Sequence, residues 1–492
     1  MEDTCVSVSG KSDKNKSFYL FYGACVVAYL LAALVYQCVS FSPAILYGVS
    51  AVPFLLCVAG LHRFCPEAFR HWGMRLMLLL LCWVCIALLW NEQYDVFFIQ
   101  NLPFICSMPI AMLLFYGYGY ASAKREIYSG VRVALLICTV LITLAVSTSI
   151  IAALMEKTIY TTKAPIVWIG INSVGKARLA FLCHPNDTGL LAAVAFLIAL
   201  WLCLSCRRRV ERVLLIAAMV ILYCATALTV SRTDIIILCV GAGLMGFRFV
   251  FFQCKRRTAV MRVLFAGLTF AVLFVGLFLL TSGVGKAYNQ FKTVQGAAQA
   301  EALAAPEPNS VSDETGVVSD NQPAAPAATA APTQVSVDRI TETETSFSGR
   351  TVIWRIALHE LRAYPERILF GMTPYYISGA LTQAFYEAAH WYQVVNNVHN
   401  AYLELLVDFG LPALLLFCAF IVLLAICSIR AFFRPCKEDA VGIGYLPAIL
   451  VPILLVGIME AILGAVVNQQ FSNLVFFLLA GILFGQTGLK DR

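Results

Sequence analysis

The sequence predicts an all-α integral membrane protein with about twelve transmembrane helices and one large external loop that contains short helices. Of its 492 residues, 60% are hydrophobic and only 13% are charged, whereas about a quarter of a soluble protein is charged. Apolar stretches recur along the chain, each about 20 residues long, which is the length that crosses a hydrocarbon core. This composition excludes soluble enzymes, collagens and disordered proteins.

Twelve apolar spans are predicted, and a long connection separates the ninth from the tenth. The spans cover residues 18–37, 44–61, 73–90, 102–120, 133–154, 188–206, 213–230, 234–252, 262–281, 409–428, 441–461 and 473–488. A basic stretch precedes the first span, as in a signal peptide, but this span is longer than the usual apolar core and further spans follow it. We therefore expect it to stay as a membrane anchor.

Lysine and arginine are concentrated in every second connection, which predicts the orientation of the chain. These basic connections contain Arg63 and Arg70, Lys124 and Arg125, Arg207 to Arg209 with Arg212, Lys255 to Arg257, and Arg430, Arg434 and Lys437. Cytoplasmic loops carry an excess of such residues. Both termini are therefore expected in the cytoplasm, and the connection between spans nine and ten outside. The net charge of +7 then reflects membrane orientation.

The predicted domain organisation has three parts. Residues 1–281 contain spans one to nine, residues 282–408 form the large external loop, and residues 409–492 contain spans ten to twelve. Within the loop, residues 297–340 are rich in Ala, Pro, Ser and Thr, a composition that cannot bury enough apolar surface to fold. We expect a flexible insert there and an ordered catalytic part over residues 347–400.

The ordered part of the loop begins with an amphipathic helix. Its apolar residues recur at helical spacing, Ser348 and Gly349 are suitable start residues, and Pro365 ends the helix. The apolar positions are Ile353, Ile356, Ala357, Leu361 and Tyr364. A second helical piece is predicted around residues 380–393.

Three external sites combine polar and ionisable residues. The first has Arg178 with the triplet His184-Pro185-Asn186, and the second is the pair Ser231-Arg232 between two spans. The third is the loop, with Arg350 at its helix start and His399-Asn400 before span ten. Taken singly, an arginine at a membrane edge often anchors lipid phosphate, and a lone histidine is more often structural.

Taken together, these residues favour a transferase. A guanidinium group stays charged and binds phosphates in a fork geometry, and an imidazole exchanges protons near neutral pH. Two arginines and one histidine around an outer cavity suit a diphosphate-linked lipid substrate and a nucleophilic hydroxyl. Glu404 and Asp408 share a helix face after His399 and either orient that histidine or cap the bundle.

No metal or cofactor is expected. The sequence has no DxD or HExxH motif on the external side and no nucleotide-binding GxxxxGK[ST] loop. Cys203 and Cys206 form a CxxC without a second pair, so a packing role is favoured over metal binding.

Five motifs follow one another over roughly residues 170–430: HPNDTG, VSRTD, SGRTVIWRIAL, FG and NNVHNAYLELLVDFGLP. In this order they resemble the O-antigen ligase and polymerase superfamily of bacterial envelope glycosyltransferases. The resemblance implies a metal-independent, inverting transfer of a glycan from an undecaprenyl-diphosphate carrier to a sugar hydroxyl. It places this reaction at the outer face of the bacterial cytoplasmic membrane.

The resemblance also implies residue roles. Arg232 and Arg350 are similar to the arginines that hold the carrier diphosphate, and His399 is similar to the residue that engages the acceptor hydroxyl, as general base or orienting group. The remaining expected substrate-binding residues are Arg178, His184, Asn186, Asn400, Ser231 and Trp354. The expected partners are the lipid-linked donor, a glycan or glycolipid acceptor and membrane lipid, without nucleic acid.

Two other functions are alternatives to the transferase. A transporter or flippase of lipid-linked oligosaccharides would also have twelve spans, but it predicts internal repeats and ionisable residues in mid-span, whereas the charged candidates here lie at the outer rim. A non-catalytic scaffold for envelope assembly is the third possibility. Within the transferases, the sequence does not decide between a ligase and a polymerase.

Overall fold

A computed structural model describes most of the chain, and it is mostly helical. The described residues are 9–38, 43–92, 109–155, 157–160, 168–172, 178–206, 208–303, 348–389, 398–435, 442–458 and 471–487.

The first half of the molecule consists of helices interrupted by one small sheet. Its elements are α1 (Ser9–Cys38), α2 (Pro43–Phe64), α3 (Glu67–Arg70), α4 (Trp72–Glu92), the π-helix η1 (Ile110–Tyr116), α6 (Gly117–Lys124), α7 (Tyr128–Leu154), β1 (Ile159–Tyr160), β2 (Trp168–Asn172), β3 (Arg178–Phe181) and α8 (Pro185–Ser205). The second half consists of α9 (Arg209–Thr229), α10 (Arg232–Gln253), α11 (Ala259–Leu303), α12 (Ser348–Ala363), α13 (Arg367–Phe370), α14 (Pro374–Ala389), α15 (Ala401–Phe432), the 3₁₀ turn η3 (Ile443–Tyr445), α16 (Pro447–Val456) and α17 (Phe471–Thr487).

Within the described residues, eight helices are long and apolar enough to cross a membrane: α1, α4, α7, α8, α9, α10, α11 and α15. Shorter apolar helices cover Ala51–Phe64, Ile443–Val456 and Phe471–Thr487. This pattern confirms a helical membrane protein with many spans. The count of twelve stays a prediction.

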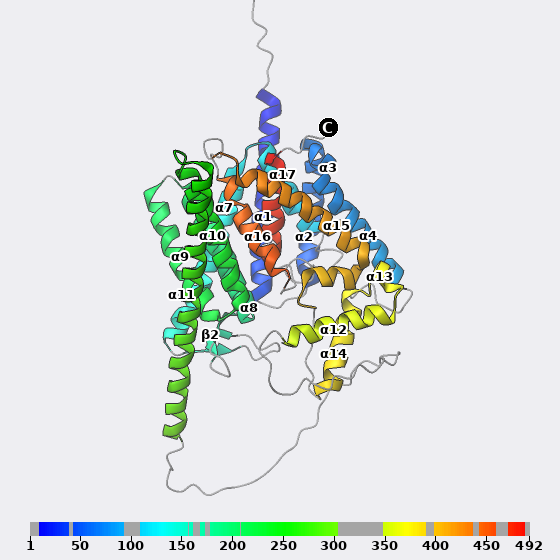
Figure 1. Cartoon of the computed structure of the whole chain (residues 1–492). Coiled ribbons are helices and arrows are strands. Elements are labelled where there is room, and N and C mark those ends of the chain that lie inside the picture. Colours follow the sequence, from blue (N-terminus) through cyan, green and yellow to red (C-terminus); the bar gives the residue numbers. More distant parts are fainter. Residues whose placement is uncertain are drawn as a thin grey trace, which may run out of the picture.

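The bundle has two distinct ends (Figure 1). Helix α1 begins and α17 ends at one of them, called here the terminal end. The sheet, α12 and α14 lie at the opposite end, called here the loop end. The shared end of α1 and α17 agrees with the expectation that both termini lie on one side, whereas the side of the membrane on which each end lies stays a prediction.

The three-stranded sheet was not predicted. Its strands are antiparallel in the order β1-β2-β3, with Ile159 opposite Ile169 and Gly170 opposite Ala180. The Ser149 hydroxyl of α7 donates to the Ala180 carbonyl over 2.7 Å. The sheet therefore covers the loop end of α7 and leads directly into α8.

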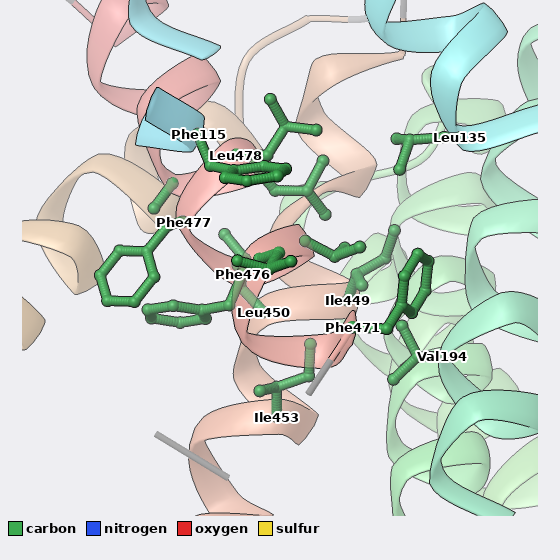
Figure 2. Close-up of a cluster of buried hydrophobic side chains, with 14 of the residues drawn as sticks. Phe115, Leu135, Val194, Ile449, Leu450, Ile453, Phe471, Phe476, Phe477 and Leu478 are labelled. Atoms are coloured by element: carbon green, nitrogen blue, oxygen red, sulfur yellow. The ribbon is translucent and has the colours of Figure 1, made fainter. Parts of the chain in front are cut away.

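Helix α17 lies in the centre of the core. Phe471, Phe476 and Phe477 of α17 belong to one buried hydrophobic cluster with Leu450 and Ile453 of α16 (Figure 2). On its other side α17 packs closely on η1 and α6, because a Cβ atom on Gly481 would come within 2.2 Å of the Tyr116 carbonyl oxygen. Small residues permit such close backbone approach between membrane helices.

One predicted boundary needs correction. The flexible insert was predicted to begin at residue 297, but α11 continues without interruption to Leu303. The physical reason is that residues 282–303 contain no proline and include good helix formers such as Lys, Gln, Glu and Ala. The rest of the predicted insert, residues 304–340, lies outside the described residues. The end of span nine at residue 281 stays a prediction.

The loop helices agree better with the sequence. Helix α12 covers Ser348–Ala363, and Ile353, Ile356, Ala357 and Leu361 are buried as predicted. The second piece, predicted at residues 380–393, is displaced toward the amino terminus, because α14 begins at Pro374 and reaches Ala389. Proline is well suited to the first position of a helix.

Helix α15 contains a kink at Gly410, which has φ 83° and ψ 178°. Pro412 cannot donate the usual hydrogen bond to the Asp408 carbonyl. That carbonyl accepts from the Thr373 amide over 3.0 Å, and the Phe409 carbonyl accepts from Nε1 of Trp83 over 2.8 Å. The kink therefore separates a short segment at the loop end, residues 401–409, from the rest of the span.

Candidate active site

The turn between α9 and α10 presents Arg232 at the loop end. Val230 has a left-handed backbone (φ 55°) and ends α9, and buried Ser231 occupies the N-cap position of α10 without a capping hydrogen bond from its side chain. Arg232 is exposed, and it has no hydrogen-bond or ion-pair partner among the described residues. The amino terminus of a helix favours anions, so the helix end and the guanidinium group together suit a phosphate.

Arg178 is engaged within the protein. Its Nε donates to the Thr229 carbonyl over 2.8 Å, and its Nη2 donates to Oδ1 of Asn186. These bonds join β3, the start of α8 and the end of α9. Arg178 and Asn186, both predicted to bind substrate, therefore lie together, and their bonds hold the turn that carries Arg232.

His184 is the N-cap of α8. Its Nδ1 accepts a hydrogen bond from the Asn186 amide over 3.3 Å, and Pro185 follows as the first helical residue. The HPN triplet is thus a helix-start structure, with the proline at the position that helices favour. The imidazole remains exposed at the loop end.

Helix α12 carries Arg350 in its first turn, where the residue is half-buried. A small separate hydrophobic cluster holds this helix against the kinked start of α15. The cluster contains Ile353, Ile356, Ala357, Leu361, Met372, Ile377, Leu381, Val398 and Val407. The position of Arg350 relative to α15 is therefore set by apolar packing.

The backbone around His399 is fixed on both sides. On one side, Nε1 of Trp354 in α12 donates to the Val398 carbonyl over 2.9 Å. On the other, the Ala401 amide donates to the Gly457 carbonyl over 2.8 Å. His399 itself has φ 53°, a left-handed conformation that costs a non-glycine residue about 1 kcal/mol or more. Such strain persists only where the surroundings impose it.

Asn400 and Trp354 have structural contacts that the sequence did not indicate. The Oδ1 atom of Asn400 accepts from the amides of Tyr402 and Leu403 over 3.0 and 2.9 Å, so Asn400 is the N-cap of α15. Both residues were predicted to bind substrate. In the structure each of them holds the backbone next to His399.

Glu404 and Asp408 are buried on the first segment of α15. The backbone carbonyls of Val407 and Asp408 accept hydrogen bonds from the amides of Met372 and Thr373, which follow the FG motif. Oε2 of Glu404 has no hydrogen-bond partner among the described residues. The segment that carries Glu404 and Asp408 is thus hydrogen-bonded to the loop residues that follow the FG motif.

The packing of Arg367 between two tyrosine rings was not predicted from the sequence. Its guanidinium carbon lies 4.4 Å from the ring centre of Tyr364 and 4.6 Å from that of Tyr376. Burial raises the pKa of Tyr376, and the hydrogen bond and charge of Arg367 oppose that rise. The spacing of Tyr364 and Arg367, three residues apart, was the available signal.

The predicted residues thus form two groups at the loop end (Figure 1). Arg178, His184, Asn186, Ser231 and Arg232 belong to β3 and the ends of α8, α9 and α10, whereas Arg350, Trp354, His399 and Asn400 belong to α12 and the start of α15. In the described part of the chain, no three His, Cys, Asp or Glu side chains lie together in a way that could hold a metal ion. Metal independence stays a prediction.

Comparison with known families identifies the region that carries most of these residues. Residues 217–418 match the family model described as O-antigen ligase. The matched segment includes Arg232, Arg350 and His399, and it leaves out Arg178 and the HPN triplet. None of the curated proteins matches the chain. The match confirms, over residues 217–418, the resemblance to the O-antigen ligase and polymerase superfamily that the motifs show.

Proposed function

We propose that the protein is a membrane glycosyltransferase that moves a glycan from an undecaprenyl-diphosphate carrier to an acceptor sugar hydroxyl. The family supports a lipid-linked glycan donor and a polysaccharide acceptor in general. The reaction takes place at the loop end, which is the outer face of the cytoplasmic membrane in this proposal. The positive-inside pattern of the connections supports that orientation.

The observation that carries the proposal is the conformation of His399. A strained backbone that is held from both sides, here by Trp354 and by Gly457, is typical of functional sites. A functional role for the imidazole accounts for this arrangement.

In the proposed step, the acceptor hydroxyl oxygen attacks the anomeric carbon of the donor sugar. The new bond joins that carbon to the acceptor oxygen, and the bond between the carbon and the diphosphate oxygen breaks. The hydroxyl proton passes to His399 as general base, and the polyprenyl diphosphate leaves with the electron pair. Attack from the face opposite the leaving group inverts the configuration.

Arg232 and Arg350 hold the diphosphate in this proposal. Negative charge grows on the leaving group as the glycosidic bond breaks, and fixed positive groups lower the energy of that state. Arg232 is suited to this role by its exposure and by its position at a helix start. No covalent intermediate or cofactor is needed.

The imidazole can be tested separately from the backbone. Asn adopts the left-handed conformation more readily than other non-glycine residues, so His399→Asn removes the imidazole with little added strain, and His399→Ala adds the strain of alanine. We expect both variants to abolish glycan transfer in cells while they insert at normal levels. His62→Ala, at an exposed histidine of the terminal end, is the control and should retain transfer. Normal surface polymer in the His399→Asn strain would overturn the catalytic assignment.

The lipid-linked intermediates of a deletion strain distinguish the two kinds of transferase. If the protein is a polymerase, mass analysis finds single repeat units on the carrier. If it is a ligase, long chains accumulate on the carrier. An unchanged pool of both would contradict the proposed function.

A further inference from the structure

A cavity of about 280 Å³ lies at the terminal end, far from the proposed active site. It is lined by residues at the ends of α15 and α17 and in η3: Arg430, Ala431, Arg434, Ile443, Gly444, Gln486 and Thr487. Two of these are arginines, and none is acidic. Gln486 is held in place, since its Oε1 accepts from Nη1 of Arg434 over 3.1 Å and its amide nitrogen contacts the Tyr128 hydroxyl.

A third arginine lies behind Gly444, one of the lining residues, because a Cβ atom on Gly444 would come within 2.1 Å of Cζ of Arg248. Arg248 of α10 is completely buried, and it donates to the carbonyls of Ala431, Phe432 and Arg434 at the end of α15. Carbonyls at a helix end carry partial negative charge and repel anions. Because these carbonyls accept hydrogen bonds from Arg248, their negative charge is offset by a guanidinium group at the end of α15.

We propose that this cavity binds a phosphate group, and that the group belongs to the headgroup of an anionic membrane phospholipid. A guanidinium group pairs with phosphate oxygens in a fork geometry, and Arg430 and Arg434 both line the cavity. A cavity of this size is at the lower limit for drug-sized ligands and suits a headgroup.

An exposed apolar ridge on α15 leads away from the cavity. It consists of Val422, Ile426, Ile429 and Phe433, which are 38–60% exposed. These residues recur at intervals of three or four, so they share one helix face, and Arg430 follows Ile426 by one turn. An acyl chain on this ridge would continue directly from a phosphate in the cavity, which favours a lipid over a soluble phosphate.

The simplest competing explanation is that the arginines only orient the chain in the membrane. The connection after α15 also contains Lys437, Glu438 and Asp439, which together have a net charge of −1. Arg248, Arg430 and Arg434 exceed that charge, so the cavity region stays positive. If the arginines served only to orient the chain, neither the cavity nor the buried position of Arg248 would be needed. Binding measurements distinguish the two explanations.

The test uses the full-length protein in nanodiscs and the double variant Arg430→Gln/Arg434→Gln. The control is Arg256→Gln/Arg257→Gln, which removes two exposed arginines from the turn between α10 and α11. Native mass spectrometry counts phosphatidylglycerol retained by each protein when it is released from mixed phosphatidylglycerol and phosphatidylethanolamine. Thermal shift in detergent then compares phosphatidylglycerol with inorganic phosphate.

We expect the wild type and the control to retain phosphatidylglycerol and the double variant to bind it about tenfold more weakly, as for loss of charge-assisted hydrogen bonds. If inorganic phosphate stabilises the wild type, phosphatidylglycerol does not, and the double variant loses this effect, the cavity binds phosphate. That result would overturn the proposal that the phosphate belongs to a lipid. Equal retention by all three proteins, or no preference for phosphatidylglycerol, would overturn the proposal. Glycan transfer by each protein is measured in parallel. If all three proteins lack transfer, the proposed function is contradicted, whereas the lipid proposal is still decided by the binding measurements.

Discussion

The two ends of α10 carry an arginine each, and the two residues have opposite environments. Arg232 begins the helix at the loop end and is exposed. Arg248, at the terminal end, is fully buried, and its guanidinium group donates to three backbone carbonyls. It also lies 4.8 Å from the ring centre of Phe252 and 5.1 Å from that of Tyr445.

This difference shows how one residue type serves two purposes in a membrane protein. A buried charge is tolerated only when it is paired or hydrogen-bonded, and both terminal nitrogens of Arg248 donate to carbonyls at the end of α15. An exposed arginine at a helix start has no such structural role. Substitution at Arg248 should therefore change stability, and substitution at Arg232 should change transfer.

The largest effect is expected for Arg232→Met. The side chain keeps its length and loses its charge, so the stabilisation of the leaving diphosphate is lost, at a cost of about 10²- to 10³-fold in rate. Transfer is measured with the purified protein and a polyprenyl-diphosphate donor. Arg355→Met, at an exposed arginine of α12, is the control. An Arg232→Met protein with full activity and lower thermal stability would reverse the assigned roles.

The same substitution at the other end, Arg248→Met, should lower the free energy of unfolding by about 3 kcal/mol. The carbonyls at the end of α15 lose their donor in a buried site, which is the costly case for a hydrogen bond. Thermal unfolding in detergent measures the change, and transfer by the surviving folded protein should match the wild type. Unchanged stability would mean that water or lipid replaces the guanidinium group.

The contrast between these arginines also marks the limit of sequence reasoning. The motifs around Arg232, Arg350 and His399 were recognised because each has a polar or charged residue at the start of an apolar helix pattern. Arg248 lies inside an apolar span, and its partners are backbone carbonyls 183 to 186 residues away in the chain. Backbone carbonyls have no residue type, so no pattern in the sequence indicates this contact.

The fold was predictable to a similar degree. Apolar length and basic connections locate the helices, because lipid requires every backbone group of a span to be bonded internally. The sheet β1–β3 was missed, since its short strands are defined by pairing across connections and not by periodicity. The extension of α11 to Leu303 was missed because hydropathy ends at the membrane, whereas helix propensity continues beyond it.

A smaller effect is expected for Gly444→Ala, which disturbs the cavity wall without removing a charge. A Cβ atom at this position would lie 2.1 Å from Cζ of Arg248, so the guanidinium group has to move. Overpacking of this kind costs about 1–3 kcal/mol. Gly267→Ala is the matched control, because a Cβ atom there meets no atom within 4 Å. Equal unfolding temperatures for the two variants would show that Arg248 adjusts freely.

The smallest effect is expected at the loop end, for the single hydrogen bond from Trp354 to the Val398 carbonyl. Like the Arg248 contacts at the terminal end, this bond joins a side chain to a backbone carbonyl. Trp354→Phe keeps the aromatic packing and removes the donor, which costs about 1 kcal/mol. Because the lost bond fixes the residue before His399, the transfer rate should fall by about tenfold, whereas donor affinity should change little if Trp354 acts through position. Trp72→Phe, at an exposed tryptophan, is the control. A fall in donor affinity at an unchanged rate would instead assign Trp354 to substrate binding, as its motif first indicated.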